Sequence, residues 1–217
     1  MQGLLRGMFA LVATVALLGS APADEASEVI ASSAARMAPL QSYTFKIHVD
    51  FKLKTFPYIG IHLDGDGSFK KPDLFSIHFH HVPWFGKGWE NINLDPLEPS
   101  KWKETYDFTD VQKIGDRFHL LMMAHDKGHL KNVAAEIDDD GLRRVQWNYL
   151  NGGWIAVEVN PSRINGFPLP KTENAEIKVP GYHVLAQARF EDYKLVTEEA
   201  ASQSDTSADR PPYSGGN

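Results

Sequence analysis

The residues best suited to chemistry are three histidines on two predicted strands. His78 and His80 alternate with apolar residues within GDGSFKKPDLFSIHFHH (residues 65–81), and His62 has the same parity on the preceding strand. If the hairpin between these strands turns at residues 71–72, His80 lies opposite His62 and His78 lies opposite Asp64. Imidazole nitrogens grouped in this way can bind Zn²⁺ or Cu²⁺. The competing interpretation is that alternation simply places solvated polar residues on the outer face of a strand. We therefore predict no cofactor and keep a metal site of His62, His78 and His80 as an alternative.

Signatures of catalysis are absent from the sequence. The chain contains no cysteine and no G-x-S-x-G nucleophile elbow. The GDG triplet at residues 65–67 lies within a strand and opens no helix, so it lacks the context of a phosphate-binding loop. These observations favour a protein that is not an enzyme.

The N-terminal segment is typical of a secretory signal peptide. Arg6 precedes an apolar run from Met8 to Leu18, and small residues follow as far as Ala23. This run is shorter than the about 20 residues that a transmembrane helix needs, and the lack of cysteine argues against a lipid anchor at the cleavage point. We expect cleavage after about Ala23 and a periplasmic protein that is neither lipid-anchored nor transmembrane. The formal net charge of −6 makes nucleic acid a poor partner.

Hydrophobic periodicity predicts one helix followed by a large antiparallel sheet. Apolar residues have helical spacing after residue 24, up to Met37 and Leu40, and they then alternate with polar residues from Tyr43 to Leu53 and on to Phe79. An irregular connection over residues 84–103 follows. Further strands are expected around residues 106–113, 118–124, 133–138, 142–150, 154–159, 164–169, 175–179 and 184–195. Residues 197–217 are poor in apolar side chains and are expected to be a disordered tail, which leaves one domain over residues 24–196.

One helix cannot cover such a sheet. At a spacing of ~4.8 Å, ten or eleven strands span about 50 Å, whereas a helix is about 10 Å across. The apolar face must therefore curl toward a barrel, pack on a second sheet, or keep part of its area for a ligand. A helix with a curled sheet predicts a concave cavity, in which an acyl chain would gain roughly 0.8 kcal/mol for each buried methylene. The expected lining comprises Met37, Leu40, Phe45, Ile47, Phe51, Ile61, Leu63, Phe75, Ile77, Phe79 and Trp147. The other possibility is a barrel filled by its own side chains that serves as a protein-interaction module.

A motif of the form G-x-G-x-[FLW]-x-[KR]-[KR]-P-[DN]-x-[FL] spans the second and third predicted strands. Its matching positions are Gly65, Gly67, Phe69, Lys70, Lys71, Pro72, Asp73 and Phe75, and the later stretches GFPLP (166–170) and ARFEDYKL (188–195) follow in order. Over residues 25–196, this order resembles the LolA-like superfamily of lipoprotein carriers and outer-membrane lipoprotein-sorting proteins. The resemblance implies a mainly β fold with α, a curled antiparallel half-barrel of about 10–11 strands covered by an N-terminal helix. It also implies a non-catalytic binder or carrier of lipoprotein acyl chains or other lipids.

The rim of the cavity is expected at Lys71 and in the irregular connection. In the LolA-like carriers the residue before the proline is an arginine that hydrogen-bonds the lid, and here that position is Lys71. Trp84, Phe85 and Trp89 suit a boundary between apolar and wet surroundings, so they are predicted to form a rim or lid. The expected partners are lipids or lipoprotein acyl chains, a membrane surface, and membrane-bound donor or acceptor proteins. The chain itself is expected to be a monomer.

Overall fold

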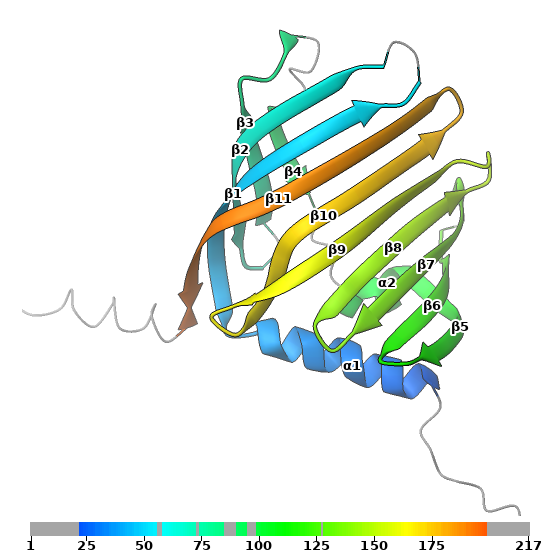
Figure 1. The fold of residues 1–217 in the computed structure, drawn as a ribbon. Coiled ribbons are helices and arrows are strands. Elements are labelled where there is room, and N and C mark those ends of the chain that lie inside the picture. Colours follow the sequence, from blue (N-terminus) through cyan, green and yellow to red (C-terminus); the bar gives the residue numbers. More distant parts are fainter. Residues whose placement is uncertain are drawn as a thin grey trace, which may run out of the picture.

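The computed structural model describes residues 22–55, 58–72, 74–84, 90–94, 99–126 and 128–198. The predicted signal peptide up to residue 21, the predicted tail from residue 199, and the rim residues Phe85 and Trp89 lie outside this description. A helix, α1 (Pro22–Met37), precedes an eleven-stranded sheet (Figure 1). None of the helices described is long and apolar enough to span a bilayer.

Most of the strands are joined to the next strand along the chain by short connections, and the longer ones flank β4. Their bounds are β1 (Leu40–Leu53), β2 (Gly60–Lys70), β3 (Leu74–His80), β4 (Asn91–Leu94), β5 (Tyr106–Ile114), β6 (Arg117–Ala124), β7 (Leu130–Asp138), β8 (Gly141–Tyr149), β9 (Trp154–Ile164), β10 (Phe167–Val179) and β11 (Tyr182–Thr197). A 3₁₀ turn, η2 (Pro99–Lys101), and a short helix, α2 (Trp102–Thr105), lie between β4 and β5.

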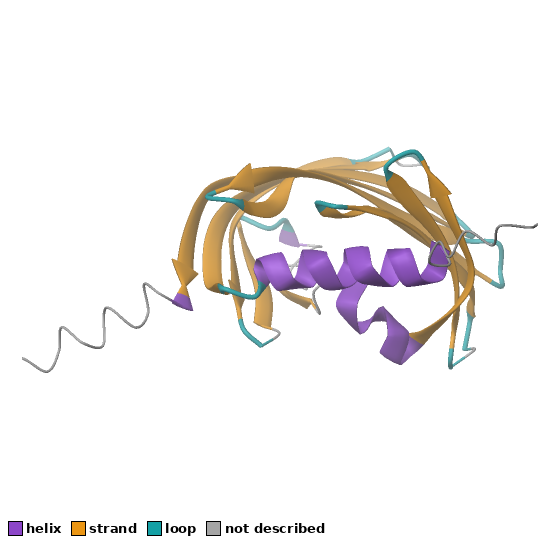
Figure 2. Cartoon of the chain, turned by 90° about the horizontal axis from the view of Figure 1, so that it is seen from below, coloured by secondary structure: helices purple, strands orange, loops and turns teal. Residues whose placement is uncertain are grey.

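The sheet is antiparallel and open. Its order is β4-β3-β2-β1-β11-β10-β9-β8-β7-β6-β5, so the first and last strands pair inside the sheet, at its fourth and fifth positions, and β4 and β5 form its edges. Figure 2 shows that the sheet is strongly curled and that α1 lies across its concave side. The predicted fold class, a curled antiparallel half-barrel with an N-terminal helix, is therefore confirmed.

Local sequence explains the position of α1. Asp24 and Glu25 occupy its first turn and Arg36 its last, which suits the helix dipole. Ala26 and Ile30, one turn apart, form the buried face. Because the helix ends at Met37, Leu40 belongs to β1 and not to the helix in which the sequence pattern grouped it.

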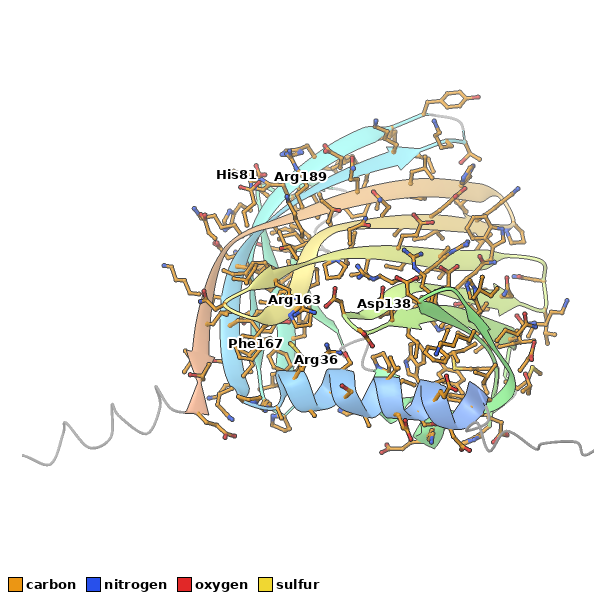
Figure 3. The ribbon with its side chains drawn as sticks, turned by 60° about the horizontal axis from the view of Figure 1, so that its bottom comes forward. Arg36, His81, Asp138, Arg163, Phe167 and Arg189 are labelled. Carbon is orange, nitrogen blue, oxygen red and sulfur yellow. The ribbon has the colours of Figure 1, made fainter. Side chains whose placement is uncertain are left out.

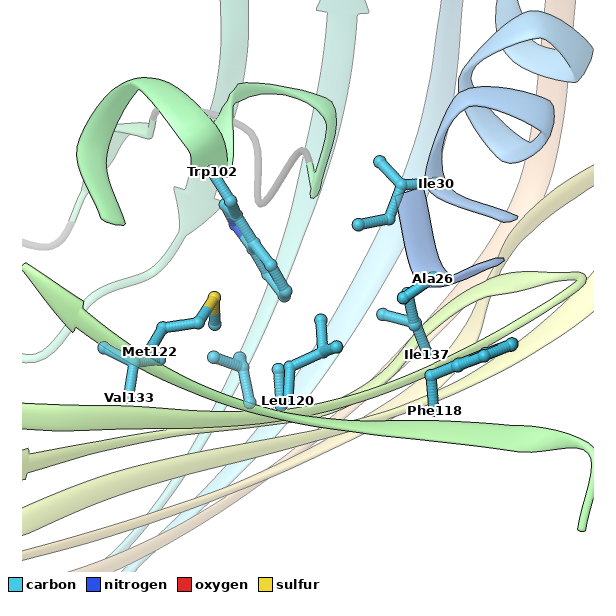
Figure 4. Packing of buried hydrophobic residues seen from close by; sticks show 10 residues of the cluster. Ala26, Ile30, Trp102, Phe118, Leu120, Met122, Val133 and Ile137 are labelled. Atoms are coloured by element: carbon cyan, nitrogen blue, oxygen red, sulfur yellow. The ribbon is translucent and has the colours of Figure 1, made fainter. Parts of the chain in front are cut away.

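Two hydrophobic clusters fill the concave side of the sheet. The first lies beneath the N-terminal half of α1 and contains Ala26, Ile30, Trp102 of α2 and inward residues of β6 to β8 (Figure 4). The second lies at the other end of the sheet on β1, β2, β3 and β11. Its buried members are Phe45, Ile47, Val49, Leu63, Ile77, Phe79 and Phe190.

Two predictions about the strands are wrong. The segment 164–169 is not a strand, because Asn165 and Gly166 have φ of 51° and 88° and form the turn between β9 and β10. The residues on either side belong to two long strands in place of three short ones. In addition, β4 pairs with β3 in a segment where no strand was expected. The sequence of β4, Asn-Ile-Asn-Leu, alternates over only four residues, which is the shortest pattern that predicts a strand.

Candidate functional site

A cavity of about 620 Å³ lies between α1 and the concave face of the sheet. Val29 and Met37 of α1 form one side of it. The opposite side is built mainly from apolar residues of β1, β2, β3, β9 and β11. Among them are Leu40, Phe45, Phe69, Phe75, Val159 and Phe190. Helix and curled sheet thus enclose an apolar space that their own side chains do not fill, which argues against the filled-barrel alternative.

An aromatic wall centred on Phe45 closes one end of this cavity. The Phe45 ring centroid lies 5.7 Å from that of Phe75, 5.4 Å from that of Phe190 and 5.6 Å from that of Tyr193. Gly67 on β2 is the direct cross-strand neighbour of Phe45, and a Cβ atom at Gly67 would lie 2.0 Å from the Phe45 Cζ atom. The GDG triplet therefore has a steric role, since its second glycine leaves room for the ring.

Three carboxyl groups line the cavity, those of Asp138, Asp140 and Glu173. Glu173 lies on β10, opposite Val159 of β9 and Ala188 of β11. Burial raises the pKa of Glu173 to about 7, and no hydrogen bond or ion pair is found for it in the described part of the chain. Nearby, the Tyr193 hydroxyl donates a hydrogen bond to the Pro170 carbonyl at 2.7 Å, and burial raises the pKa of Tyr193. The cavity is thus apolar with a few polar groups.

Charged groups attach the C-terminal half of α1 to the turn between β7 and β8 (Figure 3). Arg36 of α1 donates a hydrogen bond to the Asp139 carbonyl. In the same turn, Asp138 is only 7% exposed and accepts a hydrogen bond from Arg143 Nε at 2.5 Å. The Asp140 carboxylate accepts one from Arg163 Nη2 at 2.7 Å. These paired charges fix the turn that forms one side of the cavity mouth.

Lys71 lies at the opposite side of the mouth. It lines the cavity, and its Nζ donates a hydrogen bond to the carbonyl oxygen of Ala38, one residue beyond the end of α1. A cation at this end of a helix also interacts favourably with the helix dipole. Lys71 therefore links the predicted rim directly to the helix that covers the sheet. Trp84, by contrast, is 83% exposed and does not line the cavity.

The residues predicted to line the cavity separate into two groups. Met37, Leu40, Phe45 and Phe75 line it. The others lie outside its lining: Ile47, Leu63, Ile77 and Phe79 are buried in the second cluster, Phe51 and Ile61 pack against that cluster, and Trp147 packs against the first. Figure 1 shows that β1, β2 and β3 extend well beyond α1. Their residues away from the helix pack together in the second cluster.

The lining also contains residues that sequence reasoning did not select. Val29 precedes Ile30 on the buried side of α1, and helical periodicity could have suggested it as lining. Glu173 had no comparable signal, because a register irregularity between Pro170 and Thr172 interrupts the alternation of β10 just before it.

The polar face of β1, β2 and β3 carries the histidines. The predicted pairing is wrong, because His80 lies opposite Asp64 and His78 opposite Asp66. The β2–β3 connection is centred on Pro72, one residue later than the predicted pairing requires, and this moves each partner by two positions. His80 pairs with Asp66 at 3.0 Å and His78 with Asn91 at 2.8 Å.

A different group assembles on the same face. His48, His62 and Asp64 have potential ligand atoms within 4.8 Å of one another. The hydrogen bond to Asp50, followed by the nearby charge of Asp64, raises the pKa of His62. The hydrogen bond with His48 is the main cause that lowers the pKa of Asp64. The sequence places His48 on the same polar face, but the predicted metal group of His62, His78 and His80 did not include it, because the register between β1 and β2 cannot be read from their alternation alone.

No sequence-family model matches the chain, and no curated protein matches it. Solved structures with similar folds exist at low sequence identity. A LolA superfamily protein from Nitrosomonas europaea is 11% identical with a TM-score of 0.53, and the match covers 79% of this chain and 93% of that one. A domain described as an outer membrane lipoprotein-sorting protein, from Vibrio parahaemolyticus, is 8% identical with a TM-score of 0.56, over 84% and 98% of the two chains. A DUF1329 family protein from Desulfovibrio piger is 8% identical with a TM-score of 0.55, over 87% and 99%. The chain therefore has the curled half-barrel fold of LolA superfamily proteins and outer membrane lipoprotein-sorting domains.

Proposed function

We propose that this protein is a periplasmic, non-catalytic binder or carrier of acyl chains, which belong either to lipids or to lipoproteins. The binding domain spans residues 24–196 and follows a signal peptide that is removed on export. The acyl chain lies in the cavity between α1 and the aromatic wall around Phe45. Membrane-bound donor or acceptor proteins are the expected partners, and the protein acts as a monomer.

The observation that carries this proposal is the apolar cavity itself. Its volume of about 620 Å³ lies within the range of roughly 300–1,000 Å³ that is common for small-molecule sites. Its lining is dominated by aliphatic and aromatic side chains, which favour a hydrocarbon ligand over a charged one. The fold it shares with a lipoprotein-sorting domain adds support of a general kind.

A cavity-blocking variant tests the proposal. Ala34 and Ala31 are both exposed on α1, but Ala34 lines the open cavity and Ala31 does not. Ala34→Trp should reduce the affinity for a fluorescent fatty acid by about tenfold or more, because displacing about two methylenes costs roughly 1.6 kcal/mol. Ala31→Trp adds the same side chain to the helix and should leave the affinity within about twofold of the parent chain.

Identification of the natural ligand completes the test. The full chain is exported by its own N-terminal segment, purified under mild conditions and extracted with organic solvent for mass spectrometry. Stoichiometric lipid in the extract, and its loss in Ala34→Trp, is the expected result. An extract without lipid from a parent chain that also fails to take up fatty acid would refute the proposal.

A further inference from the structure

We propose that His48, His62 and Asp64 form a binding site for one divalent transition-metal ion, such as Zn²⁺ or Cu²⁺, on the outer face of the sheet. This site lies on the opposite side of β1 and β2 from the cavity, because His48 alternates with the inward residues Ile47 and Val49. The inference is thus independent of the proposed lipid binding.

The register of β1 and β2 brings the ligands together. His48 lies directly opposite Asp64, and Asp50 directly opposite His62, so the four residues form a block in which imidazoles and carboxylates alternate. Both ligand-bearing strands are central to the sheet, since β1 pairs with β11 and β2 with β3. Backbone pairing on both sides therefore holds the three ligands in place before any ion binds.

One oxygen atom of Asp64 is shared by the two imidazoles. Asp64 Oδ1 lies 2.5 Å from His48 Nδ1 and 3.0 Å from His62 Nε2. Bonds from an ion to nitrogen and oxygen ligands measure about 2.0–2.2 Å, so two of them span up to about 4.4 Å. Ligand atoms that all lie within 4.8 Å of one another reach a common ion after small side-chain rotations.

In each imidazole, the ring nitrogen that does not face Asp64 faces another carboxylate. His62 Nδ1 lies 2.9 Å from Asp50 Oδ1, and His48 Nε2 lies 3.9 Å from Glu191 Oε2. A carboxylate on the second ring nitrogen is the arrangement that orients metal-ligating histidines and fixes their tautomer. Asp50 and Glu191 are thus positioning residues, and the two ring nitrogens that face Asp64 remain available as ligands.

The donor set indicates which ions would bind. Two imidazoles and one carboxylate suit Zn²⁺, Cu²⁺ and Ni²⁺, whereas Mg²⁺ prefers an all-oxygen shell. With three protein ligands, water completes the coordination of the ion. His78 and His80 lie on the same face, but His78 hydrogen-bonds to Asn91 and His80 pairs with Asp66. They therefore provide a matched pair of histidines outside the site.

Calorimetric titration of the full chain, purified without a histidine tag, tests the site. One equivalent of Zn²⁺ or Cu²⁺ should bind and Mg²⁺ should not. His62→Ala and Asp64→Asn should each weaken Zn²⁺ binding at least about tenfold, and Asp50→Asn should weaken it by a similar factor through lost orientation. The double variant His78→Ala, His80→Ala should retain affinity within about twofold.

A second readout locates the ion. Bound Cu²⁺ should broaden the imidazole NMR signals of His48 and His62 more strongly than those of His78 and His80. His62 and Asp64 are each about half exposed on the outer face, so their variants should keep the far-UV circular dichroism of the parent chain. The proposal is overturned if the parent chain shows no saturable binding, or if the His78, His80 double variant loses as much affinity as His62→Ala.

Discussion

Glu173 shows how a single residue departs from the pattern around it. The cavity wall is otherwise built mainly of aliphatic and aromatic side chains, and burial raises the pKa of this carboxyl group from 4.5 to about 7. A carboxylic acid that is partly neutral near pH 7 can donate a hydrogen bond to an ester or amide carbonyl of a ligand. Within the proposed function, Glu173 would orient the polar end of the lipid.

The raised pKa predicts a specific pH dependence of stability. The folded state holds the Glu173 proton more tightly than the unfolded state does, so this group's contribution falls as the pH rises from about 4.5 to about 7. Glu173→Gln should therefore raise the free energy of unfolding at pH 8 by about 1–3 kcal/mol. Each pKa unit corresponds to about 1.4 kcal/mol, reduced here by solvent in the cavity. Below about pH 4.5 the two proteins should be equally stable.

Denaturant titrations at pH 4.5 and pH 8 measure this effect. Glu158→Gln, on the outer face of neighbouring β9, is the control and should change stability by less than about 0.5 kcal/mol at either pH. Equal stability of Glu173→Gln and the parent chain at pH 8 would show that the cavity does not oppose ionisation of this carboxyl group.

Among the elements, β2 carries a glycine motif whose role is packing and not chemistry. Its inward positions run from Leu63 through Gly65 and Gly67 to Phe69, so two glycines interrupt a line of large side chains. The Phe45 ring occupies the space above Gly67 and contacts the aromatic rings of β3 and β11. Because neighbouring rings surround Phe45, it cannot move aside at little cost.

Gly67→Ala should therefore lower the free energy of unfolding by about 1–3 kcal/mol, which is typical of overpacking. Gly60→Ala, on the same strand, is the control, because the nearest atom to its added Cβ is 4.0 Å away. Thermal and denaturant melts of both variants decide the matter. In a Phe45→Leu background the cost of Gly67→Ala should shrink, and an unchanged cost would mean that the ring is not the source of the conflict.

How much the sequence could predict also differs between elements. Alternation identified β1, β2 and β3 correctly, because a strand with one buried face has an apolar residue at about every second position. Alternation could not give the register between strands, so it paired His80 with His62 and placed His48 on the polar face without assigning it to the group. In β9 and β10 the prolines at 161, 168 and 170 interrupted the pattern and obscured the turn at Asn165 and Gly166.

At the scale of the whole molecule, α1 is a cover held by few buried side chains. Only Ala26 and Ile30 are buried among its described side chains, whereas β1 buries Leu40, Phe45, Ile47 and Val49. Hydrogen bonds from Arg36 and Lys71 fasten its C-terminal end to the turn and to the rim. An element with little buried area opens locally at a lower free energy than the sheet beneath it.

Hydrogen exchange should therefore be faster for the amides of α1 than for those at the β1–β11 pairing. Lys71→Met removes the hydrogen bond to Ala38 and should speed exchange in α1 by about fivefold, equivalent to about 1 kcal/mol, with little change in β1. Saturation with fatty acid should slow exchange in α1. If α1 and the β1–β11 pairing exchange at the same rate, the helix does not open independently of the sheet.

The pairing of β1 with β11 also bears on how the chain reaches its final form. The sheet has two arms, β1 to β4 on one side and β5 to β11 on the other. Among the described strands, the arms pair with each other through residues 40–53 and 184–197. Contacts between residues so far apart are slow to form and require nearly the whole polypeptide. If the chain is exported as proposed above, β1 can pair with β11 only after the last strand emerges from the membrane. A chain truncated before residue 182 would leave two arms that do not pair with each other and have exposed edges.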